Sequence, residues 1–331
     1  MPKMTNSCKD VLVVAETAVG QASDLSYELL GLARRLVQGS GGLVHAAVLE
    51  EPGARCIQDL GARGADQVFS ISDDKPNAYE AERWLAALPS LLAEREPAHV
   101  LLGHTALGAE LGPRLAFRLG ATVATGCERV DLNAGKLTVL RPCFGNKARE
   151  AITLQRSPAI ATVRARMYDP LPPAAREVEV ISVVAAMGDA PSTTVLGRAL
   201  EAAAEGARLE RAKIVIAGGR GLGDAGGFQV LEKLAAMVGG AVGASRVACD
   251  LGWVPHSRQI GLSGKTISPD LYVAVGISGA SQHMAGCGKA RAILAINSDP
   301  EAAIFKEATF GVVGDYKEIV PALIEAIATP R

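Results

Sequence analysis

Polar residues that can hold a phosphate-bearing ligand gather between residues 261 and 300. Leu271–Val275 is a short apolar run rich in strand-forming residues, and 290–296 is a second such run. The two runs lie about twenty residues apart, which leaves room for one crossover helix between parallel strands. Ser278 and Gly279 are therefore predicted to lie where the first strand ends and the helix begins. Unpaired backbone amides at a helix start favour an anion, typically a phosphate.

Further polar residues fall at the same predicted edge of the sheet. Gln282 and His283 follow in the first turns of the helix, and Asn297 closes the second strand. A single Ser-Gly turn or a single histidine is more often structural, so the prediction depends on how many polar groups converge. Open α/β sheets bind ligands in the crevice at the carboxyl ends of their strands. The pattern therefore indicates a nucleotide site.

A glycine-rich loop follows another predicted strand at 213–217. Gly221, Gly223 and Gly226 fit the G-x-G-x-x-G dinucleotide pattern after a strand and before a helix. The acidic residue that would bind the ribose is missing from its expected place. A conventional NAD site is therefore not predicted.

Several ordered motifs resemble one known family. The resemblance is to the FAD-binding domain of the alpha subunit of electron transfer flavoproteins, and it is dense from residue 213 to the C-terminus and weaker before. The motifs are AGGRGL at 217–222, VGASR at 242–246, YVAVGISGASQHMAG at 272–286, AINSDPEA at 295–302 and FGVVGD at 310–315. The resemblance implies that the chain binds FAD and pairs with a beta subunit.

Two arginines are poorly explained as charges that only keep a helix face soluble. Arg220 stands among glycines at a strand end, and Arg246 follows the glycine at 243. A permanently cationic guanidinium beside a flavin would favour its anionic reduced forms. Salt bridges to a partner subunit are the alternative explanation for both residues.

The resemblance also implies roles for individual residues. Around the flavin ring it implies Arg246, with Ser245 close to it, Ser263 near N5 and His283 on the pyrimidine side. Around the ribityl chain and pyrophosphate it implies Gln259, Ser278 and Gln282. At the adenosine end it implies Asn297 and Asp315. The expected cofactor-binding set is completed by Arg220, Gly261, Gly264 and Gly279.

Two loops depart from the family pattern. Gly-Gln-Thr-Gly is replaced by Gly261-Leu262-Ser263-Gly264, so the hydroxyl is kept and an amide is lost at Leu262. Val-Pro-Asn-Asp is replaced at 254–257 by a sequence with His256 in its third position. We expect His256 to be a loop residue without a further role.

The first half of the chain alternates predicted strands and helices. Strands are predicted at 11–15, 43–49, 67–71 and 99–104, with amphipathic helices between them, which favours α/β with a mostly parallel sheet. Between 126 and 164 four shorter strands, the last at 159–164, predict an antiparallel extension. This half resembles the adenine-nucleotide-hydrolase-like fold shared by both subunits of the family. The second half is predicted to be a Rossmann-like, doubly wound domain.

His104 and Thr105 end a predicted strand and make a second nucleotide site conceivable. The family holds AMP in the other subunit, so none is assigned here. The expected division is an N-terminal domain over 1–190, a linker over 191–209 and the FAD-binding domain over 210–331. Such a linker would let the flavin reach different partners.

Composition narrows the compartment and the class of partner. The chain has 331 residues, with 34 Lys and Arg against 35 Asp and Glu, so charge gives no case for nucleic acid or a membrane surface. The six cysteines stand alone, without metal-site spacing, as in a reducing compartment. No signal segment and no membrane-spanning run is visible. We expect a cytoplasmic protein without membrane insertion.

The expected function is an FAD-dependent electron carrier. By the resemblance it would take electrons from acyl-CoA-type dehydrogenases, as in fatty acid beta-oxidation, and pass them to a quinone reductase or similar acceptor. No catalytic triad, carboxylate pair or metal site is predicted, so it would have no substrate chemistry of its own. One alternative is an NADH-oxidising, electron-bifurcating complex with its extra flavin on the beta subunit. Another is a nucleotide-binding sensor without a redox role.

Overall fold

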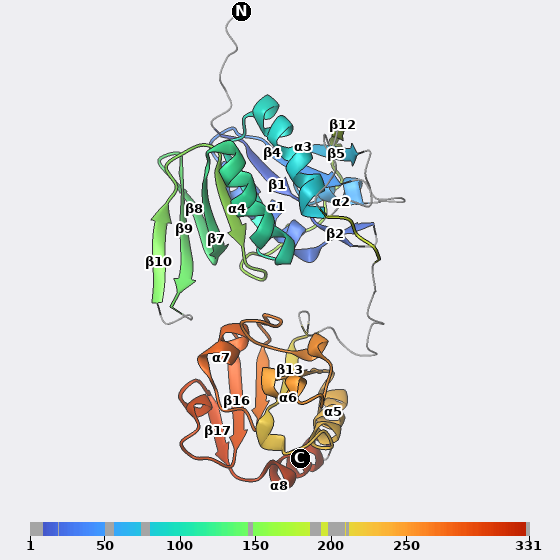
Figure 1. Cartoon of the computed structure of the whole chain (residues 1–331), viewed down its shortest axis with the longest axis vertical. Helices are drawn as coiled ribbons and strands as arrows, with labels where there is room; N and C mark the ends of the chain where they lie inside the picture. The colour runs from blue at the N-terminus through green and yellow to red at the C-terminus, as the bar shows by residue number, and fades with distance from the viewer. Residues whose placement is uncertain are drawn as a thin grey trace, which may run out of the picture. The chain divides into compact units, whose positions relative to one another are not determined.

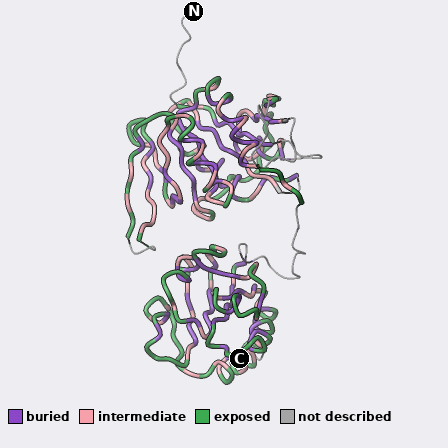
Figure 2. Tube along the Cα trace, in the orientation of Figure 1, coloured by how far each residue is buried: buried purple, intermediate pink, exposed green. Residues whose placement is uncertain are grey.

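The computed structural model describes residues 9–18, 20–49, 56–73, 80–144, 148–185, 193–197, 209 and 212–328. The chain divides into two compact units, 1–198 and 199–331 (Figure 1). Most of the predicted linker, 191–192 and 198–208, lies outside the described residues. Each unit has its own buried core, which Figure 2 shows as buried strands within more exposed helices.

The first unit is built on a seven-stranded parallel sheet. The strand order is β12-β5-β4-β1-β6-β11-β7. The strands are β1 (Val11–Val14), β4 (Val44–Leu49), β5 (Gln67–Asp73), β6 (His99–Gly103), β7 (Thr122–Cys127), β11 (Ala159–Val163) and β12 (Glu179–Ala185). The small strands β2 (Thr17–Ala18) and β3 (Gln21–Ala22) pair beside it.

Helices cover both faces of this sheet because buried parallel strands need apolar cover on each side. They are α1 (Asp24–Val37), α2 (Cys56–Ala62), α3 (Glu80–Arg95) and α4 (Ala106–Leu119). One core packs α1 and α2 against the sheet, and the other packs α3 and α4. Ser23 caps α1, since its side chain accepts from the backbone N–H of Ser26.

The predicted antiparallel extension is confirmed for three strands and wrong for the fourth. The three are β8 (Arg129–Asn133), β9 (Lys136–Cys143) and β10 (Ala148–Thr153), in the order β10-β9-β8. β11 was expected among them, yet it lies parallel between β6 and β7 in the main sheet. All five of its residues are buried, which an edge strand does not require but a central strand does.

The second unit is a five-stranded parallel sheet in the order β14-β13-β15-β16-β17. This is a doubly wound arrangement: β14 is added on one side of β13, and β15 and the later strands are added on the other side, so the strand order reverses between β13 and β15. The strands are β13 (Ile214–Gly218), β14 (Ala241–Ala244), β15 (Leu271–Val275), β16 (Ala292–Asn297) and β17 (Phe310–Val313). The predicted α/β fold class is therefore confirmed for both halves.

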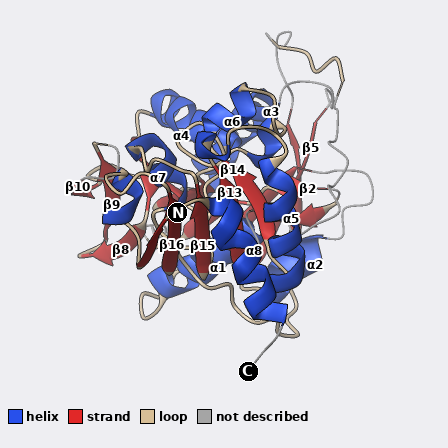
Figure 3. Ribbon diagram, turned by 90° about the horizontal axis from the view of Figure 1, so that it is seen from below, coloured by secondary structure: helices blue, strands red, loops and turns tan. Residues whose placement is uncertain are grey.

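Helices lie on both faces of the second sheet. They are α5 (Gly227–Val238), α6 (Arg246–Asp250), α7 (Ser281–Cys287) and α8 (Tyr316–Ala328), with the 3₁₀ turns η1 (Arg220–Leu222), η2 (His256–Arg258) and η3 (Ala303–Lys306). Figure 3 shows α5 and α8 side by side, and their apolar residues share one core. Residues of α7 and η3 belong to the core on the other face.

Candidate functional site

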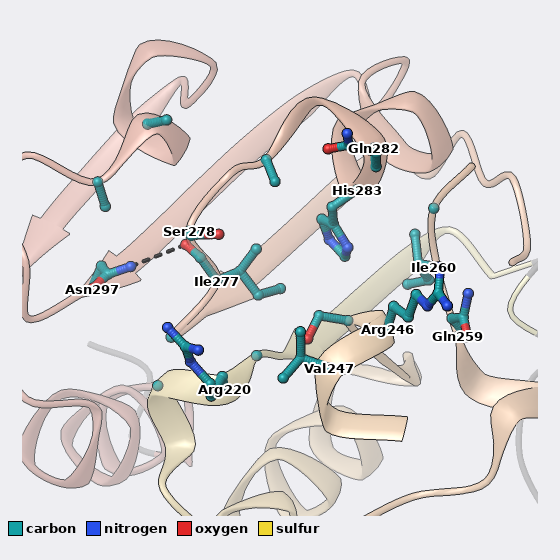
Figure 4. Close-up of a pocket in the computed structure, with 18 of the residues that line it drawn as sticks. Arg220, Arg246, Val247, Gln259, Ile260, Ile277, Ser278, Gln282, His283 and Asn297 are labelled. Atoms are coloured by element: carbon teal, nitrogen blue, oxygen red, sulfur yellow. Dashed lines mark hydrogen bonds between the residues drawn. The ribbon is translucent and has the colours of Figure 1, made fainter. Parts of the chain in front are cut away.

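A cavity of about 960 Å³ opens at the carboxyl ends of β13, β14, β15 and β16. It lies at the point where the strand order of the second sheet reverses, which is the usual place for a ligand in this fold class. Figure 4 shows side chains from several loops converging on it. The sequence alone predicted this edge of the sheet as the site.

Glycines bring two loops together at the floor of the cavity. The backbone N–H of Gly221 donates to the carbonyl of Gly276 at 3.0 Å. A Cβ on Gly221 would lie 2.8 Å from the Cα of Gly276, closer than side-chain carbons pack. Gly276 also has a positive φ of 62°, which glycine adopts without strain. The close approach therefore requires glycine at both positions and leaves backbone exposed to a ligand.

Ten of the thirteen predicted site residues line this one cavity. They are Arg220, Ser245, Arg246, Gln259, Gly261, Ser263, Ser278, Gln282, His283 and Asn297. Asn297 holds the loop after β15 in place, because its Nδ2 donates to the carbonyl of Ile277 at 3.0 Å (Figure 4). That these residues bind FAD stays a prediction.

The other three predicted residues support the loops and do not line the cavity. Gly264 lies against the backbone of Gln259, and Gly279, with a φ of 83°, lies against the backbone of η3. Asp315 precedes α8, and its carboxylate accepts from the backbone N–H of Lys317 at 2.9 Å. Gly264 and Gly279 therefore support the loops, and Asp315 supports the start of α8.

The expected start of the helix after β15 is wrong by two residues. Ser278 and Gly279 lie in a loop, and α7 begins at Ser281 with only seven residues. Glycine's positive φ at Gly279 extends the loop before the helix can begin. A ligand near Ser278 would therefore meet loop backbone and side chains, and the first turn of α7 contributes Gln282 and His283 to the cavity wall.

His283 points into the cavity (Figure 4), and Tyr272 contacts its ring. The hydroxyl of Tyr272, which is fully buried, lies 2.7 Å from Nε2 of His283. Burial raises the pKa of Tyr272 well above its ordinary value. Burial also lowers the pKa of His283 to about 4, although a backbone contact with Ile260 opposes the shift in part. At neutral pH the phenol therefore keeps its proton and the imidazole is uncharged.

The Tyr272 contact decides which ring nitrogen of His283 carries the proton. The phenol O–H donates to Nε2, since the nearby thiol of Cys287 is only a weak acceptor. The ring proton then sits on Nδ1. That atom is buried and makes no hydrogen bond of ordinary geometry among the described residues, although the backbone of Ile260 contacts the ring. His283 is thus an uncharged residue of the cavity wall.

Two guanidinium groups give the cavity its positive charge. Arg246 is exposed, and its Nε lies 3.3 Å from Oδ2 of Asp250, one turn along α6. Arg220 is exposed too, and within the described part of the chain it forms no salt bridge. Figure 4 shows the two arginines on different sides of the cavity. An anionic ligand between them would be attracted from both sides.

Sequence reasoning missed part of the lining. The cavity wall also includes Gly219, Val247, Ile260, Ile277, Asp299 and Glu301. Val247 and Ile277 provide apolar surface for a flat ring (Figure 4). The close packing of Gly219 on Gly276 could have been suspected from the glycine-rich loops, but apolar wall residues have no signature that separates them from core residues.

The second nucleotide site considered at His104 and Thr105 is filled by internal contacts. Nδ1 of His104 lies 2.9 Å from the hydroxyl of Thr162, and the hydroxyl of Thr105 donates to Glu16 at 2.7 Å. Burial raises the pKa of Glu16. That no nucleotide binds in the first unit stays an expectation.

Among the described residues no group of three or more His, Cys, Asp or Glu side chains is placed to hold a metal ion. The same residues contain no helix with the length and apolar character needed to cross a membrane. The five cysteines in the described ranges are free thiols.

Comparison with known proteins gives two family matches that together cover most of the chain. Residues 11–188 match the electron transfer flavoprotein domain, and residues 208–288 match the electron transfer flavoprotein FAD-binding domain. The chain is 36% identical to the electron transfer flavoprotein subunit alpha of Bacillus subtilis over 318 residues, covering 96% of this chain and 97% of that protein. It is 36% identical to the subunit alpha of Thermoanaerobacterium thermosaccharolyticum over 325 residues, covering 97% and 98%. It is also 37% identical to protein FixB of Azotobacter vinelandii over 329 residues, covering 96% and 91%.

Proposed function

The chain belongs to the electron transfer flavoprotein alpha-subunit family, and on that basis we propose its electron donors and its electron acceptor. As a member it has an FAD-binding domain and works as an FAD electron carrier. Its proposed donors are acyl-CoA-type dehydrogenases, as in fatty acid beta-oxidation. Its proposed acceptor is a quinone reductase or a similar protein. The proposed setting is the cytoplasm, in a heterodimer with a beta subunit.

The observation that carries the proposal is the make-up of the cavity at the reversal point of the second sheet. Its volume of about 960 Å³ suits a large cofactor. The glycine contact between residues 221 and 276 admits a ligand close to backbone, and Arg220 and Arg246 give the cavity positive charge for an anionic ligand. The residues present therefore fit FAD. When bound, FAD supplies the ability to accept and release electrons.

The roles proposed for this chain's residues follow from where they lie. Arg220 and Arg246 attract the negative charge that FAD carries and gains on reduction. His283 lines the cavity without adding charge. Val247 and Ile277 keep water from one part of the cavity. None of these roles requires a bond to be made in a substrate, which suits a carrier.

The domain division proposed for this function is 1–190, a linker over 191–209 and 210–331. The boundary between the two compact units falls between residues 198 and 199 of the sequence, within that proposed linker. We propose that the linker lets the flavin-binding unit serve more than one partner. Limited proteolysis of the native complex tests this: cleavage should concentrate within 191–209, and cleavage that falls mainly before 191 or after 209 would contradict it.

An NADH-oxidising, electron-bifurcating complex is the alternative that uses the same chain. Leu262, in the loop that departs from the family pattern, lines the cavity and is 71% exposed. Its backbone N–H donates to the carbonyl of Gln282 at 2.7 Å, so the loop is tied to α7 whatever side chain stands there. The family match supports either flavoprotein function over the nucleotide-binding sensor.

Anaerobic reduction of the chain co-purified with its partner chain separates the two functions. The carrier predicts one FAD per heterodimer, reduced by an acyl-CoA dehydrogenase with its substrate and not by NADH. Rapid reduction by NADH together with a second flavin would establish the bifurcating function instead. Failure of any acyl-CoA dehydrogenase to reduce a normally bound FAD would overturn the proposed donors.

A further inference from the structure

A series of polar contacts connects His256, which lies outside the cavity lining, with residues that line the cavity. Arg246 contacts Asp250, whose Oδ1 lies 3.9 Å from Nε2 of His256. Nδ1 of His256 lies 3.1 Å from Oε1 of Gln259, and Nε2 of Gln259 donates to Oγ of Ser263 at 3.0 Å. Arg246, Gln259 and Ser263 line the cavity, whereas His256 and Asp250 do not.

In this series of hydrogen bonds, the donor and acceptor of each bond are related to those of the next. Oε1 of Gln259 faces Nδ1 of His256, and in this arrangement the ring nitrogen carries the proton and donates it. The amide of Gln259 is thereby turned with Nε2 toward Ser263. Oγ of Ser263 accepts that bond, and its own proton has no other acceptor among the described residues. The hydroxyl of Ser263 is left to donate into the cavity.

Gln259 is the link through which His256 can act on the cavity. Its side chain is buried, and the only polar groups that it contacts in the described ranges are those of His256 and Ser263. Without a donor at position 256 the amide can turn over. Oε1 would then take the Ser263 proton, and the hydroxyl would present a lone pair to the ligand.

None of the charged groups around His256 replaces Gln259 as the partner of its Nδ1. Asp250 faces the opposite ring nitrogen, and Arg246 pairs with that same carboxylate from α6. Arg258, on the same 3₁₀ turn as His256, is paired with Glu232 of α5 at 2.7 Å. No charged side chain stands between His256 and Gln259, whose two atoms are in direct hydrogen-bond contact.

We propose that His256 is a positioning residue of the flavin site, which through Gln259 holds the Ser263 hydroxyl as a hydrogen-bond donor to the cofactor. The inference deepens the proposed function and rests on it, since Ser263 acts on a flavin only when FAD fills the cavity. An oxidised flavin accepts hydrogen bonds at its ring nitrogens, whereas the reduced ring carries N–H at the nitrogen that gains a proton. A donor at Ser263 therefore favours the oxidised form.

The test compares variants at His256 in the chain co-purified with its partner. Asparagine places its Nδ2 where histidine has Nδ1, so His256→Asn keeps the donor, and His256→Ala removes it. The dissociation constant of FAD is measured by titrating the apo complex, and the midpoint potential by equilibrium reduction. One net hydrogen bond corresponds to a change of about fivefold. His256→Ala should weaken oxidised FAD by about that factor and raise the two-electron potential by about 20 mV, with His256→Asn close to wild type.

A double-substitution cycle with Ser263→Ala identifies the route. If His256 acts through Ser263, His256→Ala should have no further effect on affinity or potential in the Ser263→Ala background. An equal effect in both backgrounds, a wild-type value for His256→Ala, or equal losses for His256→Ala and His256→Asn would each overturn the proposal. Failure of the wild-type complex to bind FAD would instead refute the proposed function, so the two failures are distinguishable.

Discussion

Replacing Tyr272 with phenylalanine removes one oxygen atom from the core of the second unit and should disturb both stability and FAD binding. The hydroxyl is the group that Nε2 of His283 contacts, at 2.7 Å, and Tyr272 is fully buried. The phenyl ring keeps nearly the same volume, so little cavity cost is expected. The main cost is a buried imidazole nitrogen left without a donor, which amounts to about 1–3 kcal/mol.

The expected result is a loss of about 2 kcal/mol, or roughly thirtyfold in the opening equilibrium. Hydrogen exchange of peptides from β15 and α7 measures it within the second unit alone. FAD should also bind more weakly, because the ring proton of His283 is no longer held on Nδ1. Tyr316→Phe is the matched control: its hydroxyl donates to the carbonyl of Leu222 at 2.9 Å, outside the cavity lining.

The refuting result is defined by a second background. If the cost comes from the orphaned Nε2, Tyr272→Phe should be nearly neutral in a His283→Leu chain, which has no such nitrogen. Equal costs in both backgrounds would show that the hydroxyl stabilises the core by another route. An unchanged FAD affinity would contradict the assigned position of the ring proton.

Three further perturbations have outcomes that the structure sets. Gly221→Ala should destabilise the second unit by at least about 2 kcal/mol and release FAD, since its Cβ would meet the backbone of Gly276 at 2.8 Å. Gly197→Ala is the control: its Cβ meets nothing within 4 Å, so the thermal unfolding temperature should not change. Burial lowers the pKa of His283 to about 4, so the folded state binds fewer protons than the unfolded state between pH 4 and 6.5. The free energy of unfolding should therefore fall by up to about 3 kcal/mol as the pH drops from about 6.5 to 4. His283→Asn should remove that part of the pH dependence in urea unfolding, and an unchanged pH dependence would contradict the assignment. Burial raises the pKa of Glu28 to about 7, so the contribution of Glu28 to stability falls as the pH rises through that value. Glu28→Gln should therefore raise the midpoint of urea unfolding near pH 8, and a lower midpoint there would refute the reasoning.

Periodicity and turn residues were enough to predict most elements of the fold. Leu271–Val275 has the predicted bounds, because an unbroken apolar run between turn residues leaves few alternatives. Ala159–Val163 was misplaced, since a short apolar run does not state which neighbours it pairs with. Pairing in a sheet is decided by residues far away in sequence.

The candidate site divides in the same way. Its location at the carboxyl edge followed from strand ends and glycines, and ten predicted residues line one cavity. The contact of Tyr272 with His283 joins a strand to a helix, and its hydrogen-bond geometry has no sequence pattern. His256 was expected to have no role because its contact with Gln259 exists only once the 3₁₀ turn has formed.

The central claim is that FAD occupies the cavity between β13 and β15, and bound flavin per chain tests it most directly. Ser278 is exposed at the cavity wall, so Ser278→Trp should fill the cavity without disturbing the core (Figure 4). The chain purified gently with its partner should be yellow and hold one FAD, and the Ser278→Trp chain should be folded and colourless. A colourless wild type, or a Ser278→Trp chain that keeps its FAD, would contradict the account.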